Sequence, residues 1–404
     1  MMNQFFTVRQ TVKYILLHRI FIIVSSLMIS SLIGCEPFAD SQDYTESRGM
    51  IFRAQTLDNV STPSINPDGS TSLRVMTWNI KYGAARIPFW FDCWGDRVQL
   101  TREEVEQNLG EIAALINEIK PDILLLEEIE LNSRRSAYMN MVQRLLDQTE
   151  LNYGAYFSTW DSRYIPSEGL GRMNLGNAIL STFPIVDSVR IKQAERTDLD
   201  ALTHPFYIKR AIGRAEIEIG EKSLAAFVVH TEAYDQDGTK QTQIEQIFKQ
   251  VSDETLPFLL GGDFNELPPT AIQREAFNDE RTSPVCGEDF AQPPYTPEKM
   301  NPFYNEFSPW VTLDEYGTTA EEQSRFFTHS VLGPDEVNEL NETVTWNRTL
   351  DYLFGNKGSE WEAGAVFQRS GQEFPSKMGQ ERLVSNPEVL SDHAPVFGIW
   401  RVTL

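Results

Sequence analysis

Polar residues that can carry chemistry stand at the ends of short apolar runs throughout this chain, and this placement constrains its fold more than any other feature. Strand ends are where a buried sheet delivers side chains into a shared cleft. Carboxylates, carboxamides and a histidine gathered in this way suit a divalent metal and a phosphate ester. The residues concerned are Asn79, Glu128, Asp263, Asn265, Asp351, Asp392 and His393.

The pattern between these residues predicts alternating strands and helices. Thr101 and Glu104 form a capping box ahead of a helical apolar face that ends at Pro121. A second helix is expected from Thr239 to about Ser252. Strands are predicted at residues 73–80, 123–126, 177–181, 211–219, 224–230, 256–260, 349–354 and 394–402. Hairpins together with helical crossovers indicate a mixed sheet.

The polar residues must converge, so the 404-residue chain is interpreted as one large domain with ample core, at 41% hydrophobic residues. The formal charge of −23 opposes tight binding of polyanions without metal ions, which disfavours a nuclease without excluding one. The same charge also fits a simple solubility role.

The first 34 residues resemble a bacterial lipoprotein signal. Arg9, Lys13 and Arg19 precede an apolar stretch that is shorter than a membrane span and ends Leu-Ile-Gly-Cys. We therefore expect a lipid on Cys35, a tether over residues 35–72, and a domain held outside the cytoplasm on a bacterial membrane, at the cell surface or in the periplasm. The alternatives are an uncleaved membrane anchor and a signal in which the cysteine is incidental.

The chain contains three short motifs, which are Thr77-Trp78-Asn79, Gly-Gly-Asp-Phe-Asn ending at Asn265, and Ser-Asp-His ending at His393. They resemble those of the endonuclease/exonuclease/phosphatase superfamily. The resemblance covers residues 73–404 and is interrupted by a loop-rich insertion at about 275–345. It implies an α/β fold, a four-layer sandwich of two mixed β-sheets flanked by helices. Many relatives have Leu-Gln-Glu where this chain has Leu126-Glu127-Glu128, so the metal-ligand role is assigned to Glu128.

The resemblance also implies roles for these side chains. Glu128 and Asp392 are the expected ligands of Mg²⁺, for which Mn²⁺ could substitute, and Asn79 supports the metal or a water on it. Asp351 and His393 match the carboxylate–imidazole pair of the family. Asp263 handles a proton or orients the attacking water. Asn265, two residues further along an extended segment, is expected to face the same side and donate to the phosphate.

Other assignments are less specific. His230 matches the deoxyribonuclease-like arrangement, whereas many relatives place their histidine where this chain has Thr231. Gly176-Asn177 resembles a strand entry of the family. Arg210 and Arg214 could reach phosphate or could be ordinary strand residues, and His204 and His329 are expected to be structural or exposed.

The sequence leaves open the role of two loop regions and the bonding state of two cysteines. Aromatic residues in the insertion and in residues 81–96 could recognise substrate, but packing of the loops themselves is the favoured interpretation. Cys93 and Cys286 could form a disulfide or remain free thiols.

The sequence therefore predicts a monomeric, metal-dependent hydrolase of phosphate esters, either a phosphodiesterase or a nuclease. Its substrate would be a nucleic acid, a phospholipid or a small phosphodiester. Sphingomyelin or phospholipid diesters and polyol or sugar monoesters are alternative substrates, and a non-catalytic surface binding protein is disfavoured because every core motif residue is present.

Overall fold

The computed structural model describes residues 46–56, 65–89, 95–233, 237–274, 277, 279, 297–338, 340–344, 346–376 and 379–404. The signal segment, Cys35, Cys93 and Cys286 lie outside the described residues. Among the described residues, no helix is both long and apolar enough to span a membrane.

Two large sheets form the body of the described structure, with a two-stranded sheet beside them. The first sheet has the order β13 (Glu360–Val366), β16 (Val396–Thr403), β3 (Ser70–Asn79), β4 (Ile123–Glu130), β6 (Gly171–Ser181), β5 (Tyr153–Ile165) and β2 (Met50–Arg53). The second has the order β1 (Glu46–Arg48), β7 (Ile185–Lys192), β8 (Ala211–Ile219), β9 (Lys222–His230), β10 (Phe258–Asp263), β12 (Asp351–Gly355) and β11 (Ser308–Pro309). The small sheet pairs β14 (Glu373–Ser376) with β15 (Gly379–Arg382).

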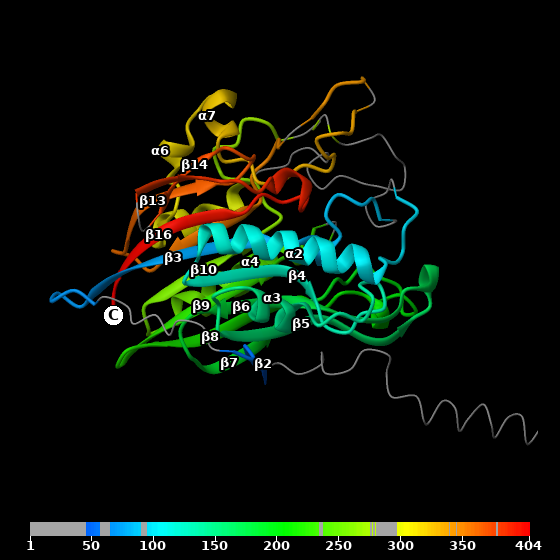
Figure 1. Cartoon of the computed structure of the whole chain (residues 1–404), viewed down its shortest axis with the longest axis horizontal. Coiled ribbons are helices and arrows are strands. Elements are labelled where there is room, and N and C mark those ends of the chain that lie inside the picture. The colour runs from blue at the N-terminus through cyan, green and yellow to red at the C-terminus, as the bar shows by residue number, and fades with distance from the viewer. Residues whose placement is uncertain are drawn as a thin grey trace, which may run out of the picture.

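Helices cover the outer faces of the two sheets, which gives the predicted four-layer α/β sandwich. Figure 1 shows α2 (Arg102–Ile119) crossing the near face of the first sheet. Next to it in the core of this face lies α3 (Met141–Gln148). The second sheet is covered by α4 (Thr239–Ser252) and α5 (Asn301–Glu306). Two short helices complete the described set, α6 (Leu313–Tyr316) and α7 (Ala320–Ser324).

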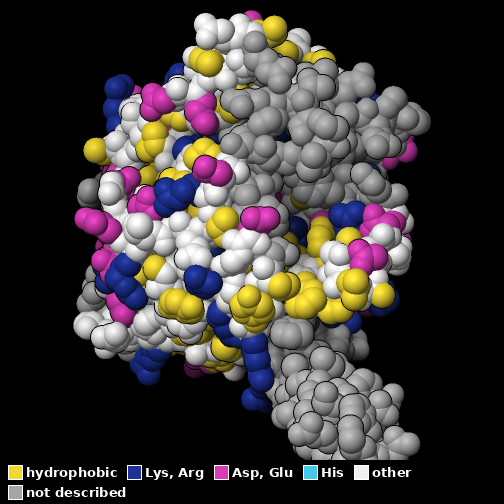
Figure 2. All heavy atoms as spheres, turned by 90° about the vertical axis from the view of Figure 1, so that its right-hand side faces the viewer, with side chains coloured by type: hydrophobic (Ala, Val, Ile, Leu, Met, Phe, Trp, Pro, Cys, Tyr) yellow, Lys and Arg dark blue, Asp and Glu magenta, His cyan; other side chains and the backbone are white. Residues whose placement is uncertain are grey.

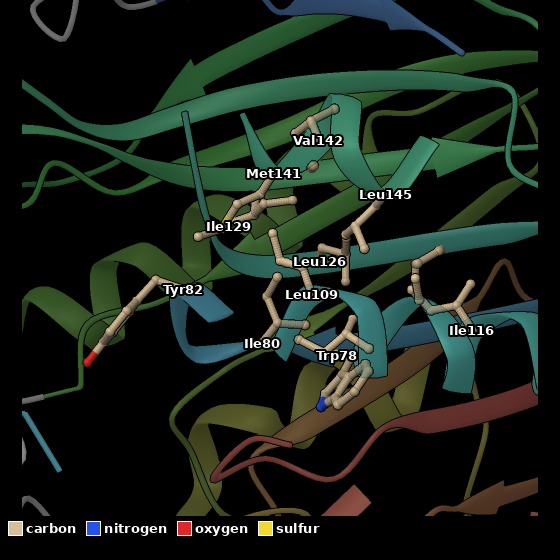
Figure 3. Packing of buried hydrophobic residues seen from close by; sticks show 14 of the residues in the cluster. Trp78, Ile80, Tyr82, Leu109, Ile116, Leu126, Ile129, Met141, Val142 and Leu145 are labelled. Atoms are coloured by element: carbon tan, nitrogen blue, oxygen red, sulfur yellow. The ribbon is translucent and has the colours of Figure 1, made fainter. Parts of the chain in front are cut away.

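The two-residue period of the strands explains why the layers form. In β3 and β4, Val75 and Leu125 face the second sheet, whereas Trp78 and Leu126 face the helices. Figure 3 shows Trp78 and Leu126 packed with Leu109 of α2. All of these side chains are fully buried or nearly so, so each strand contributes to two cores at once.

Each sheet contains one strand–helix–strand crossover that joins parallel neighbours. The first runs from β3 through α2 to β4, and the second runs from β9 through α4 to β10. Parallel strands end at the same edge of their sheet, so the residues that follow β3, β4, β9 and β10 are brought to one end of the sandwich.

The tether predicted over residues 35–72 is too long. Residues 46–48 pair with β7 and residues 50–53 pair with β5, so this segment belongs to both sheets, and β3 already begins at Ser70. The segment was misassigned because edge strands this short show no sustained apolar period.

Aromatic side chains of the described part of the insertion pack inward, as the favoured interpretation predicted. Phe303 is fully buried and makes edge-to-face contacts with Phe248 and Phe264. Tyr316 is also buried. In the other loop, Phe89 is buried edge-on against Tyr82. Trp90, Phe91, Trp94 and Tyr295 lie outside the described residues.

Candidate active site

Four strands of the two sheets deliver polar side chains to one place. Asn79, His230 and Asp263 are the last residues of β3, β9 and β10, and Asp351 is the first residue of β12. Asp263 pairs in register with His230 on one side and with Asp351 on the other, because β9 runs parallel and β12 antiparallel to β10. His393 lies just before β16.

Asp351 and His393 form a buried hydrogen-bonded pair. The His393 Nδ1 lies 2.8 Å from Asp351 Oδ2. The Thr328 hydroxyl accepts hydrogen bonds from the backbone N–H groups of Leu350 (2.9 Å) and Asp351 (3.2 Å), which holds this strand start in place. Burial lowers the pKa of His393, but Asp351 and Asp263 outweigh burial and raise it to about 10. The ring is therefore a cation near pH 7.

Asp263 stands at the centre of the site. Its Oδ2 lies 3.6 Å from His393 Nε2 and 3.3 Å from His230 Nε2, and it accepts a hydrogen bond of 3.1 Å from Asn79 Nδ2. Burial raises the pKa of Asp263, His393 lowers it and Asp351 raises it, with a result of about 7. A carboxyl group with this pKa can exchange a proton at neutral pH.

Glu128 and Asp392 lie at the mouth of the site. Their side chains are 24% and 17% exposed, compared with 2% for Asp263. Glu128 has a left-handed φ of 54° and follows a register shift in β4, so the strand bulges and turns this side chain toward Asn79 Nδ2, at 3.3 Å. Burial raises the pKa of Glu128, and Asp392 raises it further. The two carboxylates therefore repel each other.

These oxygens fit a hard divalent cation. A cation held by Glu128 and Asp392 would relieve their repulsion, and both side chains keep some exposure to solvent. Asn79 Oδ1 already accepts the Lys81 N–H at 3.0 Å. A tighter cluster, Asp263, Asp351 and His393, has ligand atoms within 4.8 Å of one another. It suits a metal poorly, because the charged ring of His393 has no free lone pair.

The predicted orientation of Asn265 is wrong. Its φ is 47°, so the segment after Asp263 turns instead of extending. The Asn265 backbone N–H donates to Asp263 Oδ1 at 2.9 Å, while its side-chain Nδ2 donates to the Thr231 carbonyl at 3.2 Å. Asn265 therefore orients Asp263. Gly262, which directly precedes Asp263, has a φ of 142°, a backbone conformation that favours glycine.

Of the two candidate positions, His230 supplies the histidine of the site, and Thr231 does not. Its Nε2 lies 4.0 Å from Glu128 Oε1 as well as beside Asp263. Burial, then Arg210, then His393 lower the pKa of His230 well below 6.5, so the ring is neutral. The Thr231 hydroxyl is buried and donates to the Phe264 carbonyl.

Two buried polar side chains near the site lack partners among the described residues. Asn177, 1% exposed, lies on β6 opposite the bulge of β4 and makes no side-chain hydrogen bond. Arg210, 5% exposed, makes no side-chain hydrogen bond or ion pair there either. Arg214, by contrast, pairs with Glu254 at 2.7 Å, so only Arg210 of the two candidate arginines stays available for phosphate.

Sequence reasoning missed three residues that the structure brings to the site. Lys81 Nζ lies 3.3 Å from Asp392 Oδ2. Glu127 is fully buried and accepts the Thr77 hydroxyl at 3.0 Å. His329, expected to be structural or exposed, lies against the ring of His393. Lys81 and Glu127 each lie within two residues of a motif residue, and this proximity could have pointed to them. No feature of the sequence pointed to His329. His204 is 41% exposed beside Glu195, as expected.

Comparison with known proteins agrees with this arrangement. Residues 76–393 match the model of the Endonuclease/Exonuclease/phosphatase family. No curated protein matches the chain significantly in sequence.

Solved structures resemble the chain at low sequence identity. An endonuclease/exonuclease/phosphatase from Beutenbergia cavernae is 17% identical, with a TM-score of 0.48, covering 82% of this chain and 72% of the other. A family protein from Bacteroides thetaiotaomicron is 13% identical, with a TM-score of 0.48, covering 82% and 98%. The mannosyl-6-phosphatase Bt3783 of that organism is 13% identical, with a TM-score of 0.47, covering 81% and 99%. These similarities are too low to indicate a substrate.

Proposed function

Because the chain belongs to the endonuclease/exonuclease/phosphatase family, whose members hydrolyse phosphate esters, we propose that it is a Mg²⁺-dependent phosphodiesterase that acts outside the cytoplasm. The observation that carries the proposal is the contact between His393 Nε2 and Asp263 Oδ2, which lie 3.6 Å apart, with the pKa of His393 raised to about 10 and that of Asp263 raised to about 7. Together they offer a charge for the phosphoryl oxygens and a group that exchanges a proton at neutral pH.

Each side chain has a defined task in this reaction. Asp263 takes a proton from the attacking water or gives one to the departing alkoxide. His393, charged and held by Asp351, stabilises the negative charge that develops on the phosphoryl oxygens. Asn79 donates to both Asp263 and Glu128 and so fixes their relative positions. Glu128 and Asp392 would hold a Mg²⁺ ion, which would supply further neutralisation of that charge.

The partnerless Asn177 and Arg210 support a phosphate ester as the substrate. A guanidinium that is buried without an acid is costly, and a phosphoryl oxygen would satisfy it. Asn177 offers an amide donor from the neighbouring sheet.

On the part of this surface that the structure describes, the charges favour a small or uncharged alcohol group over a long nucleic acid. The strand ends that carry the site lie toward the right-hand side of Figure 1. This follows because β16 starts close to the site and runs to the C-terminus, which is marked at the left. Figure 2 faces that end, where acidic and basic side chains are scattered among apolar ones and the described atoms show no continuous basic band. Such a band is the usual footprint of a nucleic-acid-binding protein.

The test is a panel assay on the purified full-length protein, with and without Mg²⁺. We expect hydrolysis of simple diesters that requires Mg²⁺ or Mn²⁺ and stops in excess chelator. Asp263→Asn should lower turnover by about 10²–10⁴-fold, while Arg382→Gln, which breaks the exposed pair with Glu373 in the small β14–β15 sheet, serves as the matched control. Undiminished turnover in chelator, or full activity of Asp263→Asn, would contradict the proposal.

A further inference from the structure

His329 lies directly against the ring of His393. The two ring centroids are 4.5 Å apart, at an interplanar angle of 68°, which is an edge-to-face contact. The two residues also form an antiparallel bridge of the backbone. Unlike His393, which is 5% exposed, His329 remains partly exposed. His329 therefore lies beside the charged imidazole and keeps part of its side chain open to solvent.

The backbone of residues 328–330 is fixed from two sides. On one side the His329 N–H donates to the Arg348 carbonyl at 3.0 Å, and the Asn347 N–H donates to the His329 carbonyl at 3.0 Å. On the other side the Ser330 N–H donates to the Asp392 carbonyl at 3.1 Å. The position of the His329 ring is thus tied to the segments that carry Asp351 and His393.

Arg348 determines which nitrogen of His329 carries the proton. Arg348 Nε donates to His329 Nδ1 at 3.1 Å, so Nδ1 is the acceptor and the proton of the neutral ring is on Nε2. Arg348 is itself held by Asp279 at 3.2 Å, and Asp279 accepts the Val331 N–H at 2.7 Å. Burial, then His393, then Arg348 lower the pKa of His329 well below 6.5, so the ring stays neutral.

The Nε2–H group of His329 has no hydrogen-bond partner among the described residues. An oriented, neutral donor beside the reacting groups fits the oxygen of a hydroxyl group. It fits a phosphoryl oxygen less well, because the cations His393 and Arg210 already serve the phosphate. An apolar alcohol in this place would displace water from the donor without replacing its hydrogen bond, which disfavours binding.

We propose that His329 is a substrate-binding residue whose Nε2–H donates to a hydroxyl oxygen of the alcohol esterified to the scissile phosphate. The site would thereby select esters of polyols or sugars over esters of apolar alcohols. This inference rests on the proposed phosphodiesterase activity and specifies its substrate class.

Two variants separate substrate binding from support of His393. His329→Phe keeps an aromatic ring against His393 and removes the donor. His329→Gln places an amide N–H near the position of Nε2 and restores the donor without the ring. Thermal melting of both proteins checks that each variant is folded.

The experiment compares 4-nitrophenyl propyl phosphate with 4-nitrophenyl 2,3-dihydroxypropyl phosphate, with the enzyme-free rate subtracted. We expect the wild-type protein to favour the dihydroxypropyl diester by about tenfold in kcat/KM, the effect of one hydrogen bond. His329→Phe should reduce this ratio to near one, and His329→Gln should recover part of it.

A wild-type ratio near one, or an equal loss on both substrates in His329→Phe, would overturn the inference. The second outcome would mean that His329 acts only through His393. If the wild-type protein hydrolyses neither diester, the proposed function itself fails and the inference fails with it. Equal hydrolysis of both diesters contradicts only the inference.

Discussion

At the scale of single residues, Asp351 and Asp263 keep the ring of His393 charged. Replacing His393 therefore removes a charge on which the proposed reaction depends. His393→Ala takes away the cation aimed at the phosphoryl oxygens, so we expect turnover to fall by roughly 10³-fold or more. His230→Ala should cost less, because that ring is neutral and contacts Asp263 and Glu128 from the side. Steady-state kinetics on one diester measures both. Near-native turnover of His393→Ala would contradict the assigned pair.

The same charge has a consequence for stability. The pKa of His393 is about 10 in the folded protein and near 6.5 in the unfolded chain. Its contribution is therefore complete below about pH 6.5 and is lost as the pH rises through 10. We expect the melting temperature of the wild-type protein to fall between pH 7 and 10.5 more than that of His393→Gln. Parallel pH profiles of the two proteins, by scanning fluorimetry, would show that the ring is not charged.

At the scale of elements, α2 connects two strands that deliver site residues, so its packing can be tested apart from the chemistry. Ile112 is fully buried between α2 and the first sheet, whereas Glu111 beside it is exposed. Ile112→Ala should lower the free energy of unfolding by about 2–5 kcal/mol. Glu111→Ala should change it by no more than about 0.5 kcal/mol. Urea denaturation checks both, and similar losses in the two variants would show that α2 is not packed as described.

Elements with a clean period could be predicted from the sequence, and irregular ones could not. The apolar face of α2 and its Thr101 capping box are present as predicted. Strand β5 was missed because its register with β6 shifts twice, after Ser158 and after Ser162, which breaks the two-residue alternation. Likewise, Asp263 was recognised from its strand end, but the left-handed turn at Asn265 leaves no trace in the pattern.

At the scale of the whole molecule, pairing across two sheets decides which residues meet, and a local pattern does not contain this information. His329 reaches His393 only because residues 328–330 lie between the segments at 347–348 and 392–394. The two residues are far apart in the sequence and share no motif. The long-range pairing of strands therefore determines the substrate side of the site, while the motif residues determine its chemistry.

We expect the molecule to be held at a membrane through its N-terminal segment. We propose that a lipid on Cys35 anchors it, and ten residues separate Cys35 from Glu46, where the first described strand begins. At about 3.3–3.6 Å per residue, this linker reaches at most about 36 Å, so the domain stays close to the membrane. Mass spectrometry of the membrane fraction should find a lipid-modified cysteine at the N-terminus, and Cys35→Ala should release the domain or block processing. An intact Met1 on the membrane-bound chain would refute cleavage at this site.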